Sequence, residues 1–252
     1  MKNDAVPGGV SIVNAEAGTK TIGVLGGMGP LATVDFFQKL VAGTCAASDQ
    51  DHLHILINNN PKIPSRVQAI CSGAPSPLPA LVHSALVLQR AGADFLVMPC
   101  NTAHVWHEQI AKAIDIPLYS IIGSTVEAVT RDFADCAGAT MLFATQATIA
   151  SGLYQRAFAL AEYPIRLPSE EEQGVVGNAI QGVKAGKLDN NEELPALHLI
   201  VQRHAASGIR LFIAGCTELP LLIPFLMADN RYEWFDPTLA LAKLAIHKAN
   251  TN

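Results

Sequence analysis

The chain has 252 residues, of which 50% are hydrophobic and 15% are charged, and its net charge is −5 at pH 7. This composition supports one large folded domain or two smaller ones and excludes a wholly disordered chain. The 17 basic residues form no run and no basic-aromatic stripe, which excludes nucleic acid as the expected partner.

The cysteine spacing and the apolar segments of the chain predict its cellular compartment. The five cysteines are widely spaced and form no C-x-x-C pair, which favours reduced thiols over a disulfide framework. Residues 1–20 contain no continuous apolar segment, so they predict a mobile tail and not a signal peptide. The most apolar stretch, residues 211–228, includes Glu218, Pro220 and Pro224, which argues against a membrane span. We therefore expect a cytoplasmic protein with no membrane partner.

Predicted strands and helices alternate along the chain. Continuous Ile, Val and Leu runs predict buried strands at residues 21–27, 53–57, 95–98, 141–144 and 211–214. Helical periodicity predicts helices between them, including residues 80–91 and 194–206. This alternation is typical of parallel βαβ units whose strands are covered by helices on both faces, and it predicts an α/β fold.

The second half of the chain repeats the pattern of the first. Residues 91–100 (AGADFLVMPC) align with residues 207–216 (SGIRLFIAGC), and each segment reads as helix end, glycine, strand and cysteine. The first strand of each half, near Thr21 and Thr140, precedes its cysteine by nearly the same number of residues. The repeat indicates a duplicated α/β unit.

The repeat also predicts the domain organisation. We expect two similar parallel-sheet α/β domains, residues 21–120 and 121–236, related by pseudo-two-fold symmetry with the active site in the cleft between them. A final helix at about residues 237–248 is expected to pack back on the first domain. An eight-stranded barrel is the alternative, because further short runs bring the number of candidate strands to eight.

Cys100 and Cys216 lie just past the carboxyl ends of two predicted strands, where open parallel sheets bind ligands. Cys100 opens Cys-Asn-Thr-Ala-His and Cys216 opens Cys-Thr-Glu-Leu-Pro, and the small polar residues that follow are suited to begin a helix. A helix N-terminus lowers the pKa of a thiol and offers backbone N–H groups to an anion. A lone cysteine is usually structural, but two at equivalent repeat positions favour catalysis.

Two thiols on opposite sides of one carbon can invert its configuration. One thiolate removes the α-proton of an amino acid while the other thiol delivers a proton to the opposite face. The negative charge that develops on the substrate carboxylate needs preorganised donors, for which backbone N–H groups and the side chains of Asn101, Thr102, Thr145 and Thr217 are candidates. The scheme requires no pyridoxal phosphate.

Two further loops follow predicted strands. Residues 26–30 (GGMGP) lack both nucleotide signatures, G-x-G-x-x-G and GK[ST], so they form either a tight turn or a close approach of backbone to a compact ligand. Residues 59–66 (NNPKIPSR) form a proline-stiffened loop that presents Arg66 at the same sheet edge as the cysteines, where its planar fork suits a carboxylate. Lys184, within GVKAG, has the pattern of an ordinary helix-surface lysine.

Six short motifs span most of the chain, from about residue 21 to residue 247: GGMGP, NNPxIPxR, MPCNTAH, T-x-x-T at 145–148, GVKAG and AGCTE. Together they resemble the aspartate racemase branch of the aspartate/glutamate racemase superfamily. The resemblance implies two similar α/β domains, a site in the cleft between them, no cofactor, no metal and a homodimer.

The same resemblance implies roles for individual residues. The acid/base pair is Cys100 and Cys216, the partners of the substrate's side-chain carboxylate are Arg66 and Lys184, and the pocket is lined by Met28, Asn101, Thr102, Thr145 and Thr217. The family loop usually reads IPDRT, whereas Ser65 and Val67 flank the arginine here. Because that acid is lost, the resemblance supports racemisation more firmly than the choice of aspartate. We expect conversion of L-aspartate to D-aspartate, with glutamate or a broader range of amino acids as the alternative.

Other functions fit parts of the pattern. Cys100, His104 and His107 with Glu108 as base suggest a zinc hydrolase, and Cys100 with His104 alone suggests an acyl hydrolase. Neither function uses Cys216. A non-catalytic protein that binds an acidic amino acid is the alternative of a different class, and it predicts binding without exchange of the α-hydrogen.

Overall fold

The computed structural model describes residues 19–226 and 231–251. Most of the predicted N-terminal tail, residues 1–20, lies outside these ranges. The backbone N–H of Lys20 donates to the carbonyl of Ala249 at 2.9 Å, which places the start of the described chain beside its end. Within the described ranges, no helix is long and apolar enough to cross a membrane.

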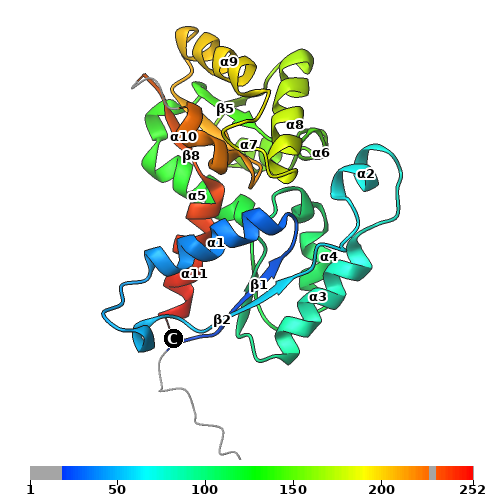
Figure 1. Ribbon diagram of the computed structural model, residues 1–252. Coiled ribbons are helices and arrows are strands. Elements are labelled where there is room, and N and C mark those ends of the chain that lie inside the picture. Colours follow the sequence, from blue (N-terminus) through cyan, green and yellow to red (C-terminus); the bar gives the residue numbers. More distant parts are fainter. Residues whose placement is uncertain (1–18, 227–230, 252) are drawn as a thin grey trace, which may run out of the picture.

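Strands and helices alternate through both halves of the chain (Figure 1). The first half contains β1 (Ile22–Gly26), α1 (Pro30–Gly43), η1 (Asp49–Asp51), β2 (Ile55–Asn59), α2 (Arg66–Cys71), α3 (Leu78–Arg90), β3 (Phe95–Val97), η2 (Thr102–Trp106), α4 (His107–Ala111) and β4 (Leu118–Tyr119), where η marks a 3₁₀ helix. The second half contains α5 (Ile121–Asp132), η3 (Ala134–Cys136), β5 (Thr140–Phe143), α6 (Gln146–Ser151), α7 (Leu153–Leu160), β6 (Ile165–Arg166), α8 (Glu170–Lys184), α9 (Leu194–Ala206), β7 (Leu211–Ala214), η4 (Leu219–Leu222), α10 (Ile223–Leu226), β8 (Glu233–Phe235) and α11 (Pro237–Ala249). The predicted strands and helices agree with these bounds to within about two residues at each end.

Two separate four-stranded sheets carry the fold. The strand order is β2-β1-β3-β4 in the first sheet and β6-β5-β7-β8 in the second, and every pairing is parallel. The same order in both sheets confirms the predicted α/β fold of two similar domains, and it contradicts the alternative of a single barrel. The edge strands β4, β6 and β8 were not predicted, because they are too short to give a hydrophobic period.

The central strands of each sheet, β1 and β3 in the first and β5 and β7 in the second, are buried on both faces, which explains their continuous apolar runs. Along β3, Val97 joins a core shared with the second half of the chain, whereas Leu96 joins a core with α3 and α4. Along β7, Ile213 joins the shared core and Phe212 joins a core with α8 and α9. The two-residue period of a strand decides these faces. One continuous hydrophobic core therefore joins the inner faces of the two sheets.

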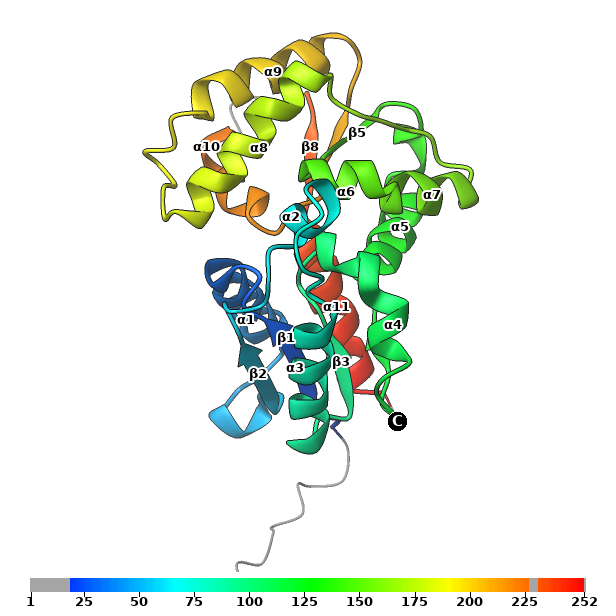
Figure 2. The same ribbon diagram turned by 90° about the vertical axis from the view of Figure 1, so that its right-hand side faces the viewer.

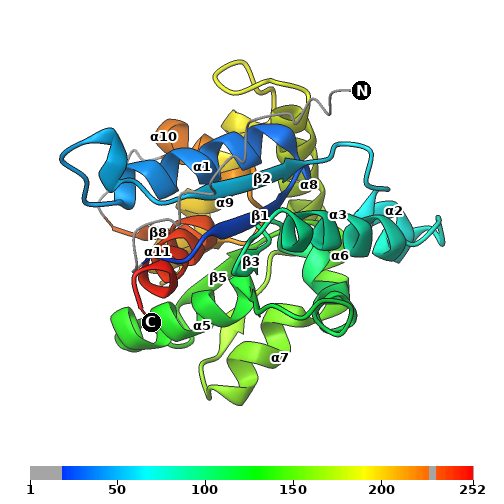
Figure 3. The same cartoon turned by 90° about the horizontal axis from the view of Figure 1, so that it is seen from below.

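The last helix, α11, connects the two halves of the fold. It packs against both α1 and α5, as Figure 3 shows from below. Its N-cap residue Asp236 accepts hydrogen bonds from the backbone N–H groups of Thr238 and Leu239. The same carboxylate forms a 2.6 Å ion pair with Lys39 of α1. A helix that follows the second sheet in sequence is thereby held against the first.

Candidate active site

A cavity of about 340 Å³ opens between the two halves, among the loops that follow the strands. Small-molecule sites of this size fit compact ligands. Every site residue singled out from the sequence lines it: Met28, Arg66, Cys100, Asn101, Thr102, Thr145, Lys184, Cys216 and Thr217. The lining also includes Pro61, Ile63, Ser65, Val67, Gln181 and Glu218. Figure 2 shows how α2, from the first half, reaches up to contact α6 of the second half at this junction.

The two candidate thiols occupy matching places in the two sheets. Cys100 follows β3 and Cys216 follows β7, and each of these strands lies next to the first strand of its half. Both side chains are buried, with 5% exposure each. The residues that follow them begin helices, as expected from the sequence, and these are the 3₁₀ helices η2 and η4. Both cysteines line the same cavity, as a two-base arrangement requires.

Cys216 has a carboxylate beside it. Its thiol donates a hydrogen bond to Oε2 of Glu218 at 2.9 Å, and the hydroxyl of Thr217 donates to the same oxygen at 3.2 Å. Burial, reinforced by the negative charge of Glu218, raises the pKa of Cys216 well above its ordinary value. The lowering expected from a helix N-terminus is therefore wrong for this thiol, because burial and the carboxylate outweigh the short 3₁₀ turn. The raised pKa favours the protonated form of the Cys216 thiol.

Three threonine hydroxyls join the two halves at the cavity wall. The hydroxyl oxygen of Thr102 lies 3.0 Å from that of Thr145 and 2.9 Å from that of Thr148. Thr145 and Thr148 close the ring at 2.9 Å, and Thr145 also caps α6 by accepting from the backbone N–H of Thr148 at 3.1 Å. A hydroxyl donates one hydrogen bond and accepts others, so the ring can satisfy itself. It holds the loop after Cys100 against α6.

The amide of Asn101 is oriented by a tyrosine from the other half of the chain. The fully buried phenol of Tyr154, on α7, donates a 2.6 Å hydrogen bond to Oδ1 of Asn101. Nδ2 of Asn101 is buried and has no hydrogen-bond partner among the described residues. A buried donor without a partner costs free energy until a ligand accepts from it. Since Asn101 lines the cavity, an anionic ligand bound there can accept a hydrogen bond from Nδ2.

Arg66 is the first residue of α2 and is held by backbone carbonyls. Its Nη1 donates to the carbonyls of Ile63 and Pro64 at 3.2 and 3.0 Å, while Nε is buried without a partner in the described part of the chain. The preceding Ser65 caps α2 by accepting from the backbone N–H of Gln68 at 3.3 Å. Serine caps a helix about as well as aspartate does. The departure from the family loop therefore keeps the cap and leaves Arg66 without an acidic neighbour there.

Lys184 ends α8 at the mouth of the cavity. The surface position expected from its sequence pattern is correct, since the side chain is exposed, but it also borders the cavity beside Arg66 and Glu218. Neither Lys184 nor Arg66 forms an ion pair with any residue in the described ranges. The lining thus carries two positive side chains and one negative one, which favours a ligand of net negative charge.

The GGMGP loop is both a tight turn and a wall of the cavity. Gly27 has a φ of +88°, and a Cβ atom there would lie 2.4 Å from the backbone of Asn60, so only glycine fits. The backbone N–H of Gly27 donates to the hydroxyl of Thr33 on α1 at 2.9 Å. The next residue, Met28, is buried and lines the cavity. The tight turn expected from the sequence is therefore confirmed, and the close approach of this backbone to a ligand stays a prediction.

The sequence and the fold are similar to those of known racemases. The Asp/Glu/Hydantoin racemase family model matches residues 25–245. The chain belongs to this racemase family. A broad-specificity amino-acid racemase of Bacillus subtilis is 25% identical over 232 residues, which cover 89% of this chain and 96% of the relative. The structure of an aspartate racemase from Picrophilus torridus is 28% identical, covers 92% of this chain and 95% of its own, and superposes with a TM-score of 0.80.

More distant members of the racemase family share the fold. An aspartate racemase homologue from Pyrococcus horikoshii, 24% identical, covers 92% of this chain and all of its own (100%) with a TM-score of 0.71. A glutamate racemase from Campylobacter jejuni, 17% identical, covers 92% of this chain and 87% of its own with a TM-score of 0.63. The arrangement of two parallel sheets is therefore that of the racemase fold.

The histidines near Cys100 have structural partners in this racemase. Nε2 of His104 accepts from the backbone N–H of Ile121 at 3.0 Å, so the ring proton is on Nδ1, which donates to the carbonyl of Cys100 at 2.9 Å. Burial lowers the pKa of His104 to about 3, and Nε2 of His107 lies 3.1 Å from the carbonyl oxygen of Leu118. His104 thus has no free nitrogen for a metal or for the thiol, which argues against the zinc and acyl hydrolases. No group of three His, Cys, Asp or Glu side chains suited to a metal occurs in the described ranges.

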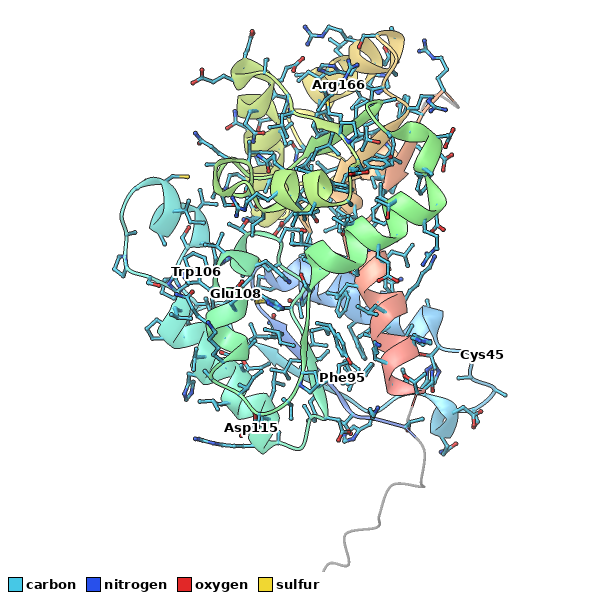
Figure 4. All side chains as sticks on the ribbon, turned by 180° about the vertical axis from the view of Figure 1, so that it is seen from behind. Cys45, Phe95, Trp106, Glu108, Asp115 and Arg166 are labelled. Carbon is cyan, nitrogen blue, oxygen red and sulfur yellow. The ribbon has the colours of Figure 1, made fainter. Side chains whose placement is uncertain are left out.

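The other cysteines lie outside the cavity. Cys45 is exposed on the loop after α1, and Figure 4 shows it on the side of the molecule opposite α2. Cys71 is exposed at the end of α2, and Cys136 is buried in η3. All three are free thiols, so they serve as matched controls for substitutions at the candidate catalytic cysteines.

Sequence reasoning missed three residues that shape the candidate active site. Glu218 stands inside the AGCTE motif, but its contact with the thiol of Cys216 depends on side-chain conformation. Thr148 and Tyr154 reach the first half of the chain only through folding. The single available signal was the T-x-x-T spacing, which is suited to a helix cap.

Proposed function

We propose that this family member is a cofactor-independent aspartate racemase that works by a two-base mechanism. One observation carries the proposal: Cys100 and Cys216, from equivalent positions in the two halves, line a single cavity. Racemisation needs two groups of similar strength on opposite faces of the α-carbon, because the reverse reaction exchanges their roles. Two similar halves that face each other are suited to supply such a pair.

In the proposed mechanism one thiolate and one thiol exchange states during each turnover. For one enantiomer, the Cys100 thiolate removes the α-proton and the Cys216 thiol gives its proton to the opposite face of the carbanion. The reaction ends with Cys100 protonated and Cys216 ionised, so protons and charges balance. The hydrogen bond from Cys216 to Glu218 and the raised pKa of that thiol support Cys216 as the proton donor in the resting site.

The carbanion needs donors for the charge that spreads into its carboxylate. Nδ2 of Asn101 is the best supported of these, because it is buried, without a partner among the described residues and oriented by Tyr154. The hydroxyl of Thr217 lies next to Cys216 in the same lining. Donors placed in advance around the carboxylate stabilise the transition state more than the substrate.

A dicarboxylic substrate is supported by the charges of the cavity. Arg66 and Lys184 line it without ion-pair partners in the described chain, and two cations are suited to grip a side-chain carboxylate. The volume of about 340 Å³ favours a compact amino acid. Similarity to the aspartate racemase of Picrophilus torridus also favours aspartate. Similarity to the Bacillus subtilis enzyme makes a broader substrate range the alternative.

The test is incubation of L-aspartate and D-aspartate in deuterated water with a reducing agent, followed by chiral separation and mass measurement. We expect both enantiomers to reach the same mixture, with one deuterium at the α-carbon of the inverted product. Glutamate and an uncharged amino acid, run in parallel, separate aspartate racemisation from broader activity. Binding of aspartate without α-deuterium would overturn the proposal in favour of a non-catalytic binding protein.

The resemblance also implies a homodimer, which stays a prediction. Sedimentation of the purified protein measures its oligomeric state.

A further inference from the structure

The two halves of the chain differ in the residues that follow Cys100 and Cys216. Cys100 is followed two residues later by Thr102, whereas Cys216 is followed two residues later by Glu218. Glu218 has 2% exposure and is the only acidic side chain in the described cavity lining. A buried carboxylate is costly unless it has partners, so the partners of its two oxygens indicate its role.

Only one oxygen of Glu218 is satisfied. Oε2 accepts from the thiol of Cys216 and from the hydroxyl of Thr217. Oε1 is buried and has no hydrogen-bond partner in the described part of the chain. A Cβ atom at Gly29 would lie 3.2 Å from Oε1, so a side chain at this position of the GGMGP loop would crowd that oxygen. Oε1 is therefore an acceptor available to a donor that a ligand brings.

Three other acceptors in the wall already have partners. Oδ1 of Asn101 accepts from Tyr154, and the hydroxyls of Thr102 and Thr145 belong to the threonine ring. A ligand with a positively charged group therefore finds at Glu218 both a free acceptor and the negative charge to match it.

The charged groups of the cavity mirror those of an acidic amino acid. Arg66 and Lys184 provide two positive charges, and Glu218 provides one negative charge. Aspartate has two carboxylates and one ammonium group. We propose that Oε1 of Glu218 accepts a hydrogen bond from the α-ammonium group of the substrate. This inference rests on the proposed function, and it assigns to Glu218 the selection of α-amino acids over dicarboxylates that lack the amino group.

The test compares the binding of L-aspartate and succinate, which differ only in the amino group. Calorimetry uses the full chain with Cys100→Ser, so that bound aspartate is not converted. We expect this protein to bind aspartate at least about tenfold more tightly than succinate, because a charge-assisted hydrogen bond has that strength. In the double variant Cys100→Ser, Glu218→Gln, we expect aspartate and succinate to bind about equally tightly, mainly because aspartate binds more weakly.

Glu172→Gln is the matched control. Glu172 is also a buried glutamate of the second half, but it pairs with His204 at 2.9 Å and does not line the cavity. We expect this variant to keep the full preference for aspartate. An unchanged preference in Glu218→Gln, or an equal loss in both variants, overturns the inference.

Two further results separate this inference from the proposed function. If neither aspartate nor succinate binds the Cys100→Ser protein, the proposed function itself fails. If Glu218→Gln does not fold, a crystal structure of the Cys100→Ser protein with L-aspartate decides the question. We expect the ammonium nitrogen within hydrogen-bond distance of Oε1 of Glu218. A nitrogen bound only by other groups overturns the inference.

Discussion

Tyr154 donates a 2.6 Å hydrogen bond to Oδ1 of Asn101 across the boundary between the two halves of the fold. Burial raises the pKa of Tyr154, so the phenol keeps the proton that it donates. The bond fixes the orientation of the Asn101 amide, whose Nδ2 is the donor that we propose for the substrate carboxylate. In that proposal, a contact between the two halves positions a group of the active site.

We expect Tyr154→Phe to lower kcat by about tenfold with little change in KM, because the donor matters most when charge develops on the carboxylate. Steady-state racemisation rates for both enantiomers measure this split. Tyr163→Phe is the matched control, since Tyr163 is a buried tyrosine of the same core whose hydroxyl bonds to Thr140 and the carbonyl of Phe133. Equal losses in both variants would mean that Tyr154 acts through stability alone.

Single-cysteine variants should divide the reaction between the two faces of the substrate. We expect Cys100→Ser and Cys216→Ser each to lose racemisation by more than about a thousandfold, because one base of the pair is missing. Each variant should still exchange the α-hydrogen of one enantiomer for deuterium with retained configuration, and the two variants should act on opposite enantiomers. Cys45→Ser, at an exposed free thiol, should racemise normally. Exchange of the same enantiomer by both variants would contradict the two-base arrangement.

Glu218 should govern the titration of Cys216. The raised pKa of this thiol comes first from burial and then from the charge of Glu218. Glu218→Gln removes the negative charge beside the thiol. We therefore expect the midpoint pH of the iodoacetamide reaction at Cys216 to fall, while it stays above the ordinary pKa range of a cysteine thiol. Peptide mass spectrometry in a Cys100→Ser background measures the rate at Cys216, with exposed Cys71 as an internal control. An unchanged midpoint would show that burial alone sets it.

His104 should make the stability of the fold depend on pH. Its pKa is about 3 in the folded protein and near 6.5 in the unfolded chain, so below about pH 6.5 only the unfolded chain takes up the proton. The free energy of unfolding should therefore fall by about 1.4 kcal/mol per pH unit between these values on account of His104. Chemical denaturation of wild type and His104→Asn from pH 7 to pH 5 tests this.

We expect the stability difference between wild type and His104→Asn to shrink as the pH falls, because the variant has lost this linkage. His83→Asn, at an exposed histidine, should keep the slope of the wild type. Parallel slopes for wild type and His104→Asn would contradict the burial of a neutral imidazole.

Lys184 should matter for acidic substrates only. We expect Lys184→Met to raise KM for aspartate by about tenfold, because one cation opposite the side-chain carboxylate is removed. The thermal midpoint should stay the same, since the side chain is exposed and has no ion pair within the described residues. Lys187→Met is the control, because Lys187 pairs with Glu192 at 2.6 Å outside the cavity. A similar rise in KM for both variants would indicate a general charge effect.

Local sequence was sufficient for the architecture of this protein and for the positions of its candidate catalytic groups. Strands buried on both faces appear as continuous apolar runs, and the glycine-strand-cysteine pattern repeats around Cys100 and Cys216. The carboxyl ends of parallel strands meet at one edge of each sheet, so a residue just after such a strand is placed by topology before any side chain is packed. The loop that carries Arg66 follows the same rule.

Tertiary structure alone decided how the side chains of the site are partnered. The bond from Tyr154 to Asn101 and the contact between Thr102 and Thr148 join residues that are far apart in sequence. The direction of the Cys216 pKa shift depended on burial, which is a property of the whole fold. Sequence periodicity reports which face of an element is apolar, whereas burial, distance and hydrogen-bond partnership arise only when both halves close around the cavity.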